Sequence, residues 1–392
     1  MSHYADDIEF LCSTPKQTQS CINALEKGLE WSNAATFRPK PAKCKALAFR
    51  HYLKGEKKSK YKKIQETAYS CFDPLLIIAN EKIGFIGDDN PPCFKYLGRW
   101  LQHDLKDDWI RDTISQKLFS WLSLIDGTPL TGPMKAWIAN HHLCAKLSWS
   151  LMIYDFPESL AKDWQASLQR YYRKWIGLNA TVEPSILYRH TEHFGLNFKH
   201  LADTLRSLQV TRWHIMKHAK DDVSRKVYRY RLSEDQKGHT GRGRKFVPSL
   251  TLESLEGKLS TKDIVGNAQT GTSGLGLRKK PPRRLKTTRK ELIAIMKGEN
   301  EQKRLVSLGK YKMQATWLSV GIDNMMHKDL TWNKLLYQCS PRLVKFLVNA
   351  IPNWLNTPDN LRRWQCKGDH KCDLCNKRNA TLAHILGGCP GY

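Results

Sequence analysis

The sequence predicts an α+β fold that is mostly α, and three observations lead to this class. The first hundred residues alternate between strand-like and helix-like periodicity. Apolar residues then recur every three or four positions over 102–232 and again over 301–365. The last residues, 366–392, form a short segment rich in Cys and His. A chain of 392 residues is long enough for two or three domains with cores of their own.

Residues 1–101 are expected to mix short strands with one helix. The stretch YADDIEFLCS fits a β-hairpin, and residues 18–34 fit an amphipathic helix with Ile22, Leu25 and Leu29 on one face. Residues 43–50 return to alternating apolar positions, and FKYLGRWL predicts a strand pair around Gly98.

Residues 102–232 are expected to be helical, and their clearest signal is an aromatic stripe that we interpret as core rather than as a cofactor site. The stripe consists of Leu160, Trp164, Leu168, Tyr171, Tyr172 and Trp175. Residues 233–300 shift to Gly, Ser, Thr, Lys and Arg, which predicts a flexible basic linker. A helical pattern resumes over 301–365 with Trp317, Leu318, Leu335, Leu343, Phe346 and Leu347. No internal repeat is present in the sequence.

The charge balance points to a polyanionic partner. Lys and Arg total 64 against 37 Asp and Glu, a formal net charge of +27. Such an excess favours nucleic acid as the partner, through phosphate neutralisation and counterion release. Two alternatives stay open: a basic surface that binds no ligand, and a basic surface that binds anionic lipid. The densest run, RKKPPRRLKTTRK over 278–290, holds eight basic residues and no acid. Gly241-Arg242-Gly243-Arg244 is interpreted as a nonspecific backbone contact.

The sequence contains no secretory signal and no transmembrane stretch. No apolar run approaches the roughly 18 residues that span a bilayer, and the N-terminus has no basic region followed by an apolar core. A soluble protein of the nucleus or cytoplasm is therefore expected.

The cysteines predict a metal site at the C-terminus. The chain has eleven cysteines, of which seven are scattered singly, so a reducing compartment is expected. The spacing Cys372-x2-Cys375-x8-His384-x4-Cys389 supplies three thiolates and one imidazole, which can close a tetrahedral zinc site. A redox role for the Cys372–Cys375 pair would leave the presence of His384 and Cys389 unexplained. His190-x2-His193 lacks a third ligand, so surface or satisfied histidines are the expected interpretation there.

Acidic pairs occur four times, so a pair alone carries no meaning. They are Asp6-Asp7, Asp88-Asp89, Asp107-Asp108 and Asp221-Asp222. Asp6-Asp7 alone is followed by an apolar strand and preceded by Tyr-Ala. Carboxylates at a hairpin tip can ligate two Mg²⁺ ions that clamp a phosphoryl displacement, although that chemistry needs one more carboxylate.

Tyr4-Ala5-Asp6-Asp7 resembles the catalytic hairpin of reverse transcriptases of non-LTR retrotransposons. PKPAKCKALAF resembles the next palm motif, whose lysine would be Lys43, and CFKYLGRWL resembles the strand pair that grips the primer end. Residues 160–178 and 186–207 resemble the helical region after the thumb. His193-Phe194-Gly195-Leu196 stands where the family has a Gly-Gly-Leu-Gly type of turn, so the match is looser there.

The resemblance implies a domain order. It consists of a partial reverse-transcriptase palm (1–101), a helical thumb and connecting region (102–232), a basic flexible linker (233–300), a helical region (301–365) and a CCHC zinc knuckle (366–392). The knuckle match leaves out Cys366 and His370, although both lie close enough in sequence to substitute as ligands.

The resemblance also implies site residues and partners. Asp6 and Asp7 would ligate Mg²⁺, Lys43 would donate a proton to the leaving pyrophosphate, and Zn²⁺ would be held by Cys372, Cys375, His384 and Cys389. Element RNA and target DNA are the expected partners, and the oligomeric state stays open. The residues expected to contact nucleic acid are Lys95, Arg242, Arg244, Lys279, Lys280, Arg283, Arg284, Arg362, Arg363, Lys377 and Arg378. Trp364 beside them is expected either to stack on a base or to pack a helix.

The family's fingers and first catalytic aspartate precede the YADD motif, so an N-terminally truncated polymerase is expected. Two functional hypotheses follow. In the first, the chain represents a retrotransposon RNA-directed DNA polymerase that binds RNA and DNA but is not expected to polymerise alone. In the second, it is a non-catalytic, repurposed nucleic-acid-binding zinc-knuckle protein.

Overall fold

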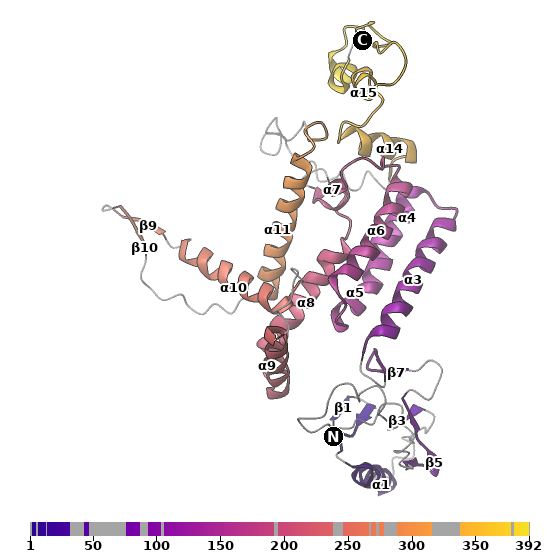
Figure 1. Cartoon of the computed structure of the whole chain (residues 1–392), viewed down its shortest axis with the longest axis vertical. Coiled ribbons are helices and arrows are strands. Elements are labelled where there is room, and N and C mark those ends of the chain that lie inside the picture. The colour runs from indigo at the N-terminus through magenta and orange to yellow at the C-terminus, as the bar shows by residue number, and fades with distance from the viewer. Residues whose placement is uncertain are drawn as a thin grey trace. The chain divides into compact units, whose positions relative to one another are not determined.

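The computed structural model describes residues 2–4, 7–12, 14–31, 43–46, 76–86, 93–102, 106–191, 195–237, 246–265, 268–271, 274–277, 288–315, 338–377 and 380–391. Within these residues the chain is mostly helical with short two-stranded sheets, which confirms the α+β, mostly α class (Figure 1). The chain divides into two compact units, Met1–Thr113 and Ile114–Tyr392. Among the described helices, none is both long enough and apolar enough to cross a bilayer.

Two short strands begin the first unit. β1 (Ser2–Tyr4) and β2 (Asp7–Glu9) are antiparallel, with Tyr4 opposite Asp7. The strand pairing expected from the YADD stretch is therefore present in the backbone. Ala5 and Asp6 lie outside the described residues, and only the backbone of Asp7 is described.

The rest of the first unit surrounds a small apolar core. α1 (Pro15–Trp31) places Ile22 against Leu76, Ile78 and Ile83. The side-chain amide of Gln19 donates to the carbonyl oxygen of Ile77 and accepts from its N–H, each at 2.9 Å, so α1 is fixed to β4. The strands are β3 (Lys45–Ala46) parallel to β6 (Gly84–Phe85), and β4 (Ile77–Ile78) antiparallel to β5 (Glu81–Lys82).

The strand pair expected around Gly98 is present as β7 (Cys93–Tyr96) and β8 (Arg99–Gln102). Leu97 and Gly98 have φ values of 46° and 81°, as a two-residue type I′ hairpin turn requires. The Arg99 guanidinium then donates to the Asp107 carboxylate at 3.2 Å, just before α3 (Asp108–Gly127) begins.

Helices build the second unit. They include α4 (Gly132–Ile138), the π-helical turn η3 (Ala139–Leu143), α5 (Cys144–Ile153), α6 (Glu158–Ile176), α7 (Ser185–Tyr188), α8 (Leu201–Lys217) and α9 (Asp222–Lys237). The aromatic stripe of α6 is largely core, as predicted: Trp164, Leu168, Tyr172 and Trp175 are buried, while Leu160 and Tyr171 are half-buried. α6 ends at Gly177, whose φ of 70° is the left-handed conformation common at helix C-termini.

Part of the segment expected to be a flexible linker is a packed helix. Residues 248–265 form α10 (Pro248–Val265), and its Leu252 and Leu255 are buried with Val210 and Trp213 of α8. Apolar burial on one face outweighs the polar composition that suggested a linker. A strand pair, β9 (Ala268–Gly271) with β10 (Gly274–Leu277), follows; residues 278–287, most of the basic run, lie outside the described residues.

α11 (Arg289–Gly309) is also anchored to the helical core. It begins with a capping box in which Thr288 and Glu291 bond each other's backbone N–H groups. The Arg304 guanidinium then pairs with the Asp203 carboxylate and donates to the carbonyl oxygen of Tyr188 at 2.9 Å. Arg189, 2% exposed, pairs with Glu301 at 2.9 Å. These partly buried ion pairs hold α11 beside α7 and α8.

The helical pattern over 301–365 is partly described. α14 (Pro341–Ala350) buries Val344 and Val348 completely, whereas Leu343 and Phe346, which belong to the helical pattern of the sequence, are 44% and 39% exposed. Trp317, Leu318 and Leu335 lie outside the described residues. α15 (Pro358–Arg363) and a final π-helical turn, η7 (His384–Gly388), complete the chain.

Candidate metal centre

The Cys/His segment is attached to α15 by a short set of backbone and side-chain bonds. Thr357 caps α15 by accepting from the Asn360 N–H at 3.2 Å. The Asn360 amide then donates to the carbonyl oxygens of Asn353 and Leu355, at 2.9 and 2.8 Å. The Asp359 N–H reaches the carbonyl oxygen of Ala380 at 3.2 Å. α15 is thereby tied both to the chain before it and to the Cys/His segment after it.

A tight turn presents the first two cysteines. The Cys372 N–H donates to the carbonyl oxygen of Lys377 at 2.9 Å, and the Asn376 N–H donates to the carbonyl oxygen of Cys372 at 2.8 Å. Asn376 has a φ of 61°, which Asn tolerates better than most residues. This closed turn keeps Cys372 and Cys375 on the same side of the loop.

The other two candidate ligands come from the last turn of the chain. The Thr381 hydroxyl accepts from the His384 N–H at 3.2 Å, which starts the turn that carries the imidazole. Cys389 follows η7 directly. A Cβ on Gly391 would lie 2.6 Å from the carbonyl oxygen of Leu374, so the end of the chain crosses the cysteine turn at contact distance.

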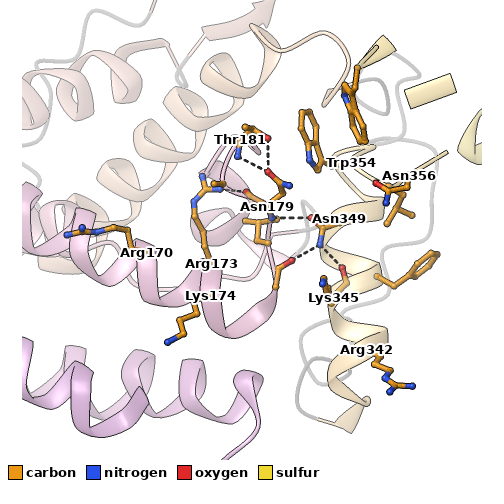
Figure 2. A pocket seen from close by; sticks show the side chains of 16 residues that line it. Arg170, Arg173, Lys174, Asn179, Thr181, Arg342, Lys345, Asn349, Trp354 and Asn356 are labelled. Carbon is orange, nitrogen blue, oxygen red and sulfur yellow. Dashed lines mark hydrogen bonds between the residues drawn. The ribbon is translucent and has the colours of Figure 1, made fainter. Parts of the chain in front are cut away.

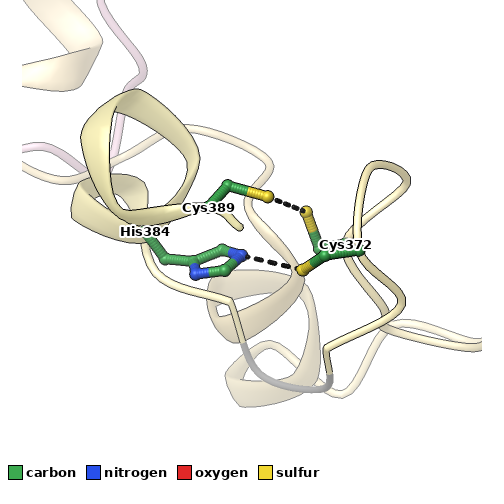
Figure 3. Close-up of side chains that lie close together, drawn as sticks. Cys372, His384 and Cys389 are labelled. Carbon is green, nitrogen blue, oxygen red and sulfur yellow. Dashed lines mark hydrogen bonds between the residues drawn. The ribbon is translucent and has the colours of Figure 1, made fainter. Parts of the chain in front are cut away.

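The four candidate ligand atoms converge, as Figure 3 shows for Cys372, His384 and Cys389. The Cys372 and Cys389 sulfurs are 3.8 Å apart, and the Cys375 sulfur is 3.3 Å from His384 Nε2. All four atoms lie within 4.8 Å of one another. Tetrahedral Zn²⁺ with bonds of about 2.3 Å to sulfur and about 2.0 Å to nitrogen would separate two sulfurs by about 3.8 Å, and sulfur from nitrogen by about 3.5 Å. The residues present fit the ion.

The electrostatics of the cysteines agree with a thiolate site. The backbone N–H groups of Leu374 and Cys375 point at the Cys372 sulfur and lower the pKa of this thiol to about 6. Burial raises the pKa of the Cys389 thiol. Since zinc binds thiolates, the lowered pKa of Cys372 favours metal binding, whereas the buried Cys389 thiol must release its proton when the metal enters.

Cys366 and His370 stay outside the set. His370 Nε2 lies 2.7 Å from the carbonyl oxygen of Cys366, so the two residues interact with each other and hold their own loop. Cys366 is exposed, whereas Cys372 and Cys389 are buried. The geometry thus agrees with the omission of both residues from the expected ligand set.

A second group of metal-type ligands occurs elsewhere in the described part of the chain. His214 of α8 and His218, the residue just after α8, lie with Glu256 of α10 so that their ligand atoms are within 4.8 Å of one another. However, Lys217 Nζ is 2.6 Å from one Glu256 oxygen. Burial lowers the pKa of Lys217, but the bond and charge of Glu256 outweigh this and raise it. We therefore interpret this group as an ion-pair network that joins α8 to α10.

The remaining expected site residues are spread along the chain. Lys43 is exposed just before β3, Lys95 is exposed in β7, and Lys377 is exposed in the cysteine turn. Arg362 and Arg363 both pair with Asp359, at 3.4 and 2.5 Å, so their charge is partly neutralised within α15. The residues outside the described part of the chain are Asp6, Arg242, Arg244, Lys279, Lys280, Arg283, Arg284, Arg378 and His193.

One basic feature was missed by sequence reasoning. A pocket between α6 and α14 is lined by cations from both helices and by Trp354 and Trp364 (Figure 2). The helical spacing of Arg170, Arg173 and Lys174 can be seen in the sequence and indicates that the three cations lie on one face of a helix. Nothing in the sequence shows that this face lies opposite α14, whose residues come about 170 positions later.

Residues 311–391 match the family model described as zinc-binding in reverse transcriptase. The match contains all four converging ligand residues. No curated protein is similar enough to this chain to count as a match. The family match and the ligand geometry together support a reverse-transcriptase-related protein with a zinc-binding C-terminal segment.

Proposed function

We propose that this protein is a nucleic-acid-binding component of a non-LTR retrotransposon reverse transcriptase, and that residues 372–389 hold one Zn²⁺ through Cys372, Cys375, His384 and Cys389. One observation carries the proposal: three sulfurs and one imidazole nitrogen converge inside the segment that matches the reverse-transcriptase zinc-binding family.

The zinc has a structural role in this proposal. Four protein ligands complete a tetrahedral shell and leave no position for water or substrate, as in structural rather than catalytic zinc sites. The apolar cluster at the site is small, consisting of Cys372, Ala380 and Cys389 with Cys375 and Ile385 packed against them. Zinc ligation, on the order of 10 kcal/mol in comparable peptides, supplies the folding free energy that such a cluster lacks.

The proposed partners are RNA and DNA. A net charge of +27 favours binding by phosphate neutralisation. Lys371 and Lys377 flank the cysteine turn; Lys371 pairs with Asp369 at 2.5 Å, and the exposed Lys377 is the cation that the folded zinc segment would present. Because RNA and DNA are the proposed partners, we propose that the protein is located in the nucleus or the cytoplasm.

The polymerase part of the proposal concerns the first unit. Asp6 and Asp7 would ligate Mg²⁺ next to the β1–β2 pair, and Lys43 would donate a proton to the leaving pyrophosphate. The antiparallel pairing of Tyr4 with Asp7 and the exposure of Lys43 support this arrangement. Primer extension by a complex containing this chain, compared with its Asp6→Ala and Asp7→Ala variants, tests the assignment.

Salt dependence and zinc dependence test the binding function together. Fluorescence anisotropy with labelled single-stranded RNA and DNA should give a Kd that rises by orders of magnitude between about 50 and 200 mM salt. Chelation of zinc should weaken binding further at each salt concentration. A Kd that does not change with salt, or the absence of any binding at about 50 mM salt, would refute the proposed function.

A further inference from the structure

We infer that the pocket between α6 and α14 binds single-stranded nucleic acid, with phosphates held by cations of both helices and a base stacked at the Trp354–Trp364 pair. The inference rests on the proposed nucleic-acid function and adds a binding site separate from the zinc centre. Its walls come from residues 170–181 and 342–364, so the family match at 311–391 includes only one of them.

The pocket has the size and charge for a polyanion. Its volume is about 1100 Å³, above the range of about 300–1,000 Å³ common for small-molecule sites. Figure 2 shows Arg170, Arg173 and Lys174 on one helix and Arg342 and Lys345 on the facing helix. Among the described residues that line the pocket, none is Asp or Glu. A cavity with cations on two sides and no lining carboxylate attracts phosphate.

Some of the cations that line the pocket already bond other groups of the protein, and others are exposed and able to bind a ligand. Arg173 donates to the carbonyl oxygens of Asn179 and Val182 and braces the loop after α6. Burial lowers its pKa, as expected for a guanidinium in a structural position. Lys174 pairs with Asp126 at 2.7 Å, which partly neutralises it. Arg342 and Lys345 are exposed on α14, so they are the main candidates for phosphate contact.

Lys345 is positioned by the end of α6. A Cβ on Gly177 would lie 2.7 Å from Lys345 Cγ, so the stem of this lysine packs directly over the glycine. The Asn349 amide, one turn later on α14, bonds the Gly177 and Lys345 carbonyl oxygens at 2.8 and 2.7 Å. The two walls are therefore held at a fixed separation, and the stem of Lys345 is held against the end of α6.

An aromatic pair completes the pocket. The Trp354 and Trp364 rings lie 4.8 Å apart at 39°, and both side chains are half-buried. Indole faces next to a cationic wall are the arrangement that proteins use to bind unpaired bases, because every base has a stacking face. A base within a duplex has both faces covered, so the pocket favours single strands. α15 lies between the two tryptophans in sequence and bonds to the zinc segment through Asp359 and Ala380.

The test compares charge-matched variants of the full chain. Arg342→Ala/Lys345→Ala removes two charges from the pocket, and Lys297→Ala/Lys303→Ala removes two exposed charges from α11, away from the pocket. Anisotropy with a labelled single-stranded dodecamer should show about a tenfold higher Kd for the pocket variant and less than about a threefold change for the α11 variant. Equal weakening by both variants would overturn the inference, and so would an effect as large on duplex DNA or on anionic lipid vesicles as on the single strand.

Base stacking has its own test. Trp354→Ala should raise the Kd for oligo-dT about tenfold, and Trp354→Phe should restore most of the affinity. On an abasic oligonucleotide of the same length, Trp354→Ala should have no effect, because no base is present to stack. An equal loss on the abasic strand would overturn the stacking assignment. Thermal melting and zinc content identify variants that misfold.

The outcomes separate the two proposals. If the wild-type chain binds no nucleic acid, the proposed function fails. If the wild type binds and loses affinity equally with pocket and α11 variants, the pocket inference fails and the proposed function stands.

Discussion

The Asn349 side-chain amide of α14 donates a hydrogen bond to the Gly177 carbonyl oxygen at 2.8 Å, joining residues 172 positions apart in sequence. The Asn349 side-chain oxygen accepts from the Asn179 N–H at 3.2 Å. Asn349 is 6% exposed, so one buried amide satisfies backbone groups left unpaired at the end of α6. This contact fixes α14 against α6.

Asn349→Ala should destabilise the second unit by about 1–3 kcal/mol, because the part-buried backbone groups of Gly177 and Asn179 lose their partner, the buried Asn349 amide. Urea unfolding followed by circular dichroism measures the effect. Arg342→Ala, an exposed change on the same helix, is the control and should cost less than about 0.5 kcal/mol. Equal stability of the two variants would show that the Asn349 contacts do not hold α14.

Cys375→Ser and His384→Ala should each lose the bound zinc, because a structural site cannot close with three protein ligands. Cys366→Ser and His370→Ala should retain one zinc per chain, since these residues bond each other outside the ligand set. Metal content by atomic absorption distinguishes the four variants. Zinc retained in His384→Ala, or lost in Cys366→Ser, would refute the ligand assignment.

Asp203 should make stability depend on acid pH. Burial raises the pKa of its carboxyl, but the hydrogen bond and charge of His200 and the charges of Arg304 and Arg206 outweigh burial and hold the pKa below its ordinary value. A lowered folded-state pKa adds stability above the unfolded value of about 3.9, and this stability is lost as the pH falls through the folded-state pKa.

Asp203→Asn should therefore lose about 1–3 kcal/mol at pH 7 and show a flatter stability profile below about pH 5. Asp222→Asn is the control, because its pair with Lys226 at 2.7 Å is exposed and worth less than about 1 kcal/mol. Denaturant titrations between about pH 3 and pH 7 measure both profiles. A profile for Asp203→Asn parallel to that of the wild type would contradict the linkage.

Cys144 should resist thiol reagents in the folded protein. Burial raises its pKa to about 11, and its side chain is 1% exposed. Because the thiolate is the nucleophile, alkylation at about pH 8 should be at least about a hundredfold slower than at exposed Cys366. Peptide mapping by mass spectrometry after timed alkylation gives both rates. Similar rates in folded protein would be inconsistent with this burial.

Local patterns determined much of the structure. The three- and four-residue spacing of Trp164, Leu168 and Trp175 identified a buried helix face, because that spacing repeats on one side of any α-helix. A Leu-Gly pair between alternating residues identified the β7–β8 turn. The spacing from Cys372 to Cys389 named four residues whose ligand atoms lie within 4.8 Å, because the candidate metal site is built within one short segment.

Tertiary structure decided what depends on contacts distant in sequence. Composition could not reveal α10, because the reason that Leu252 is buried is Trp213 on another helix. Arg170 and Arg342 look like ordinary surface cations until Asn349 joins their helices and makes them two walls of one pocket. A sequence pattern shows which residues lie on one face of a single helix or strand. Which two helices or strands pack together depends on complementary surfaces and buried polar partners, and these are seen only in the folded chain.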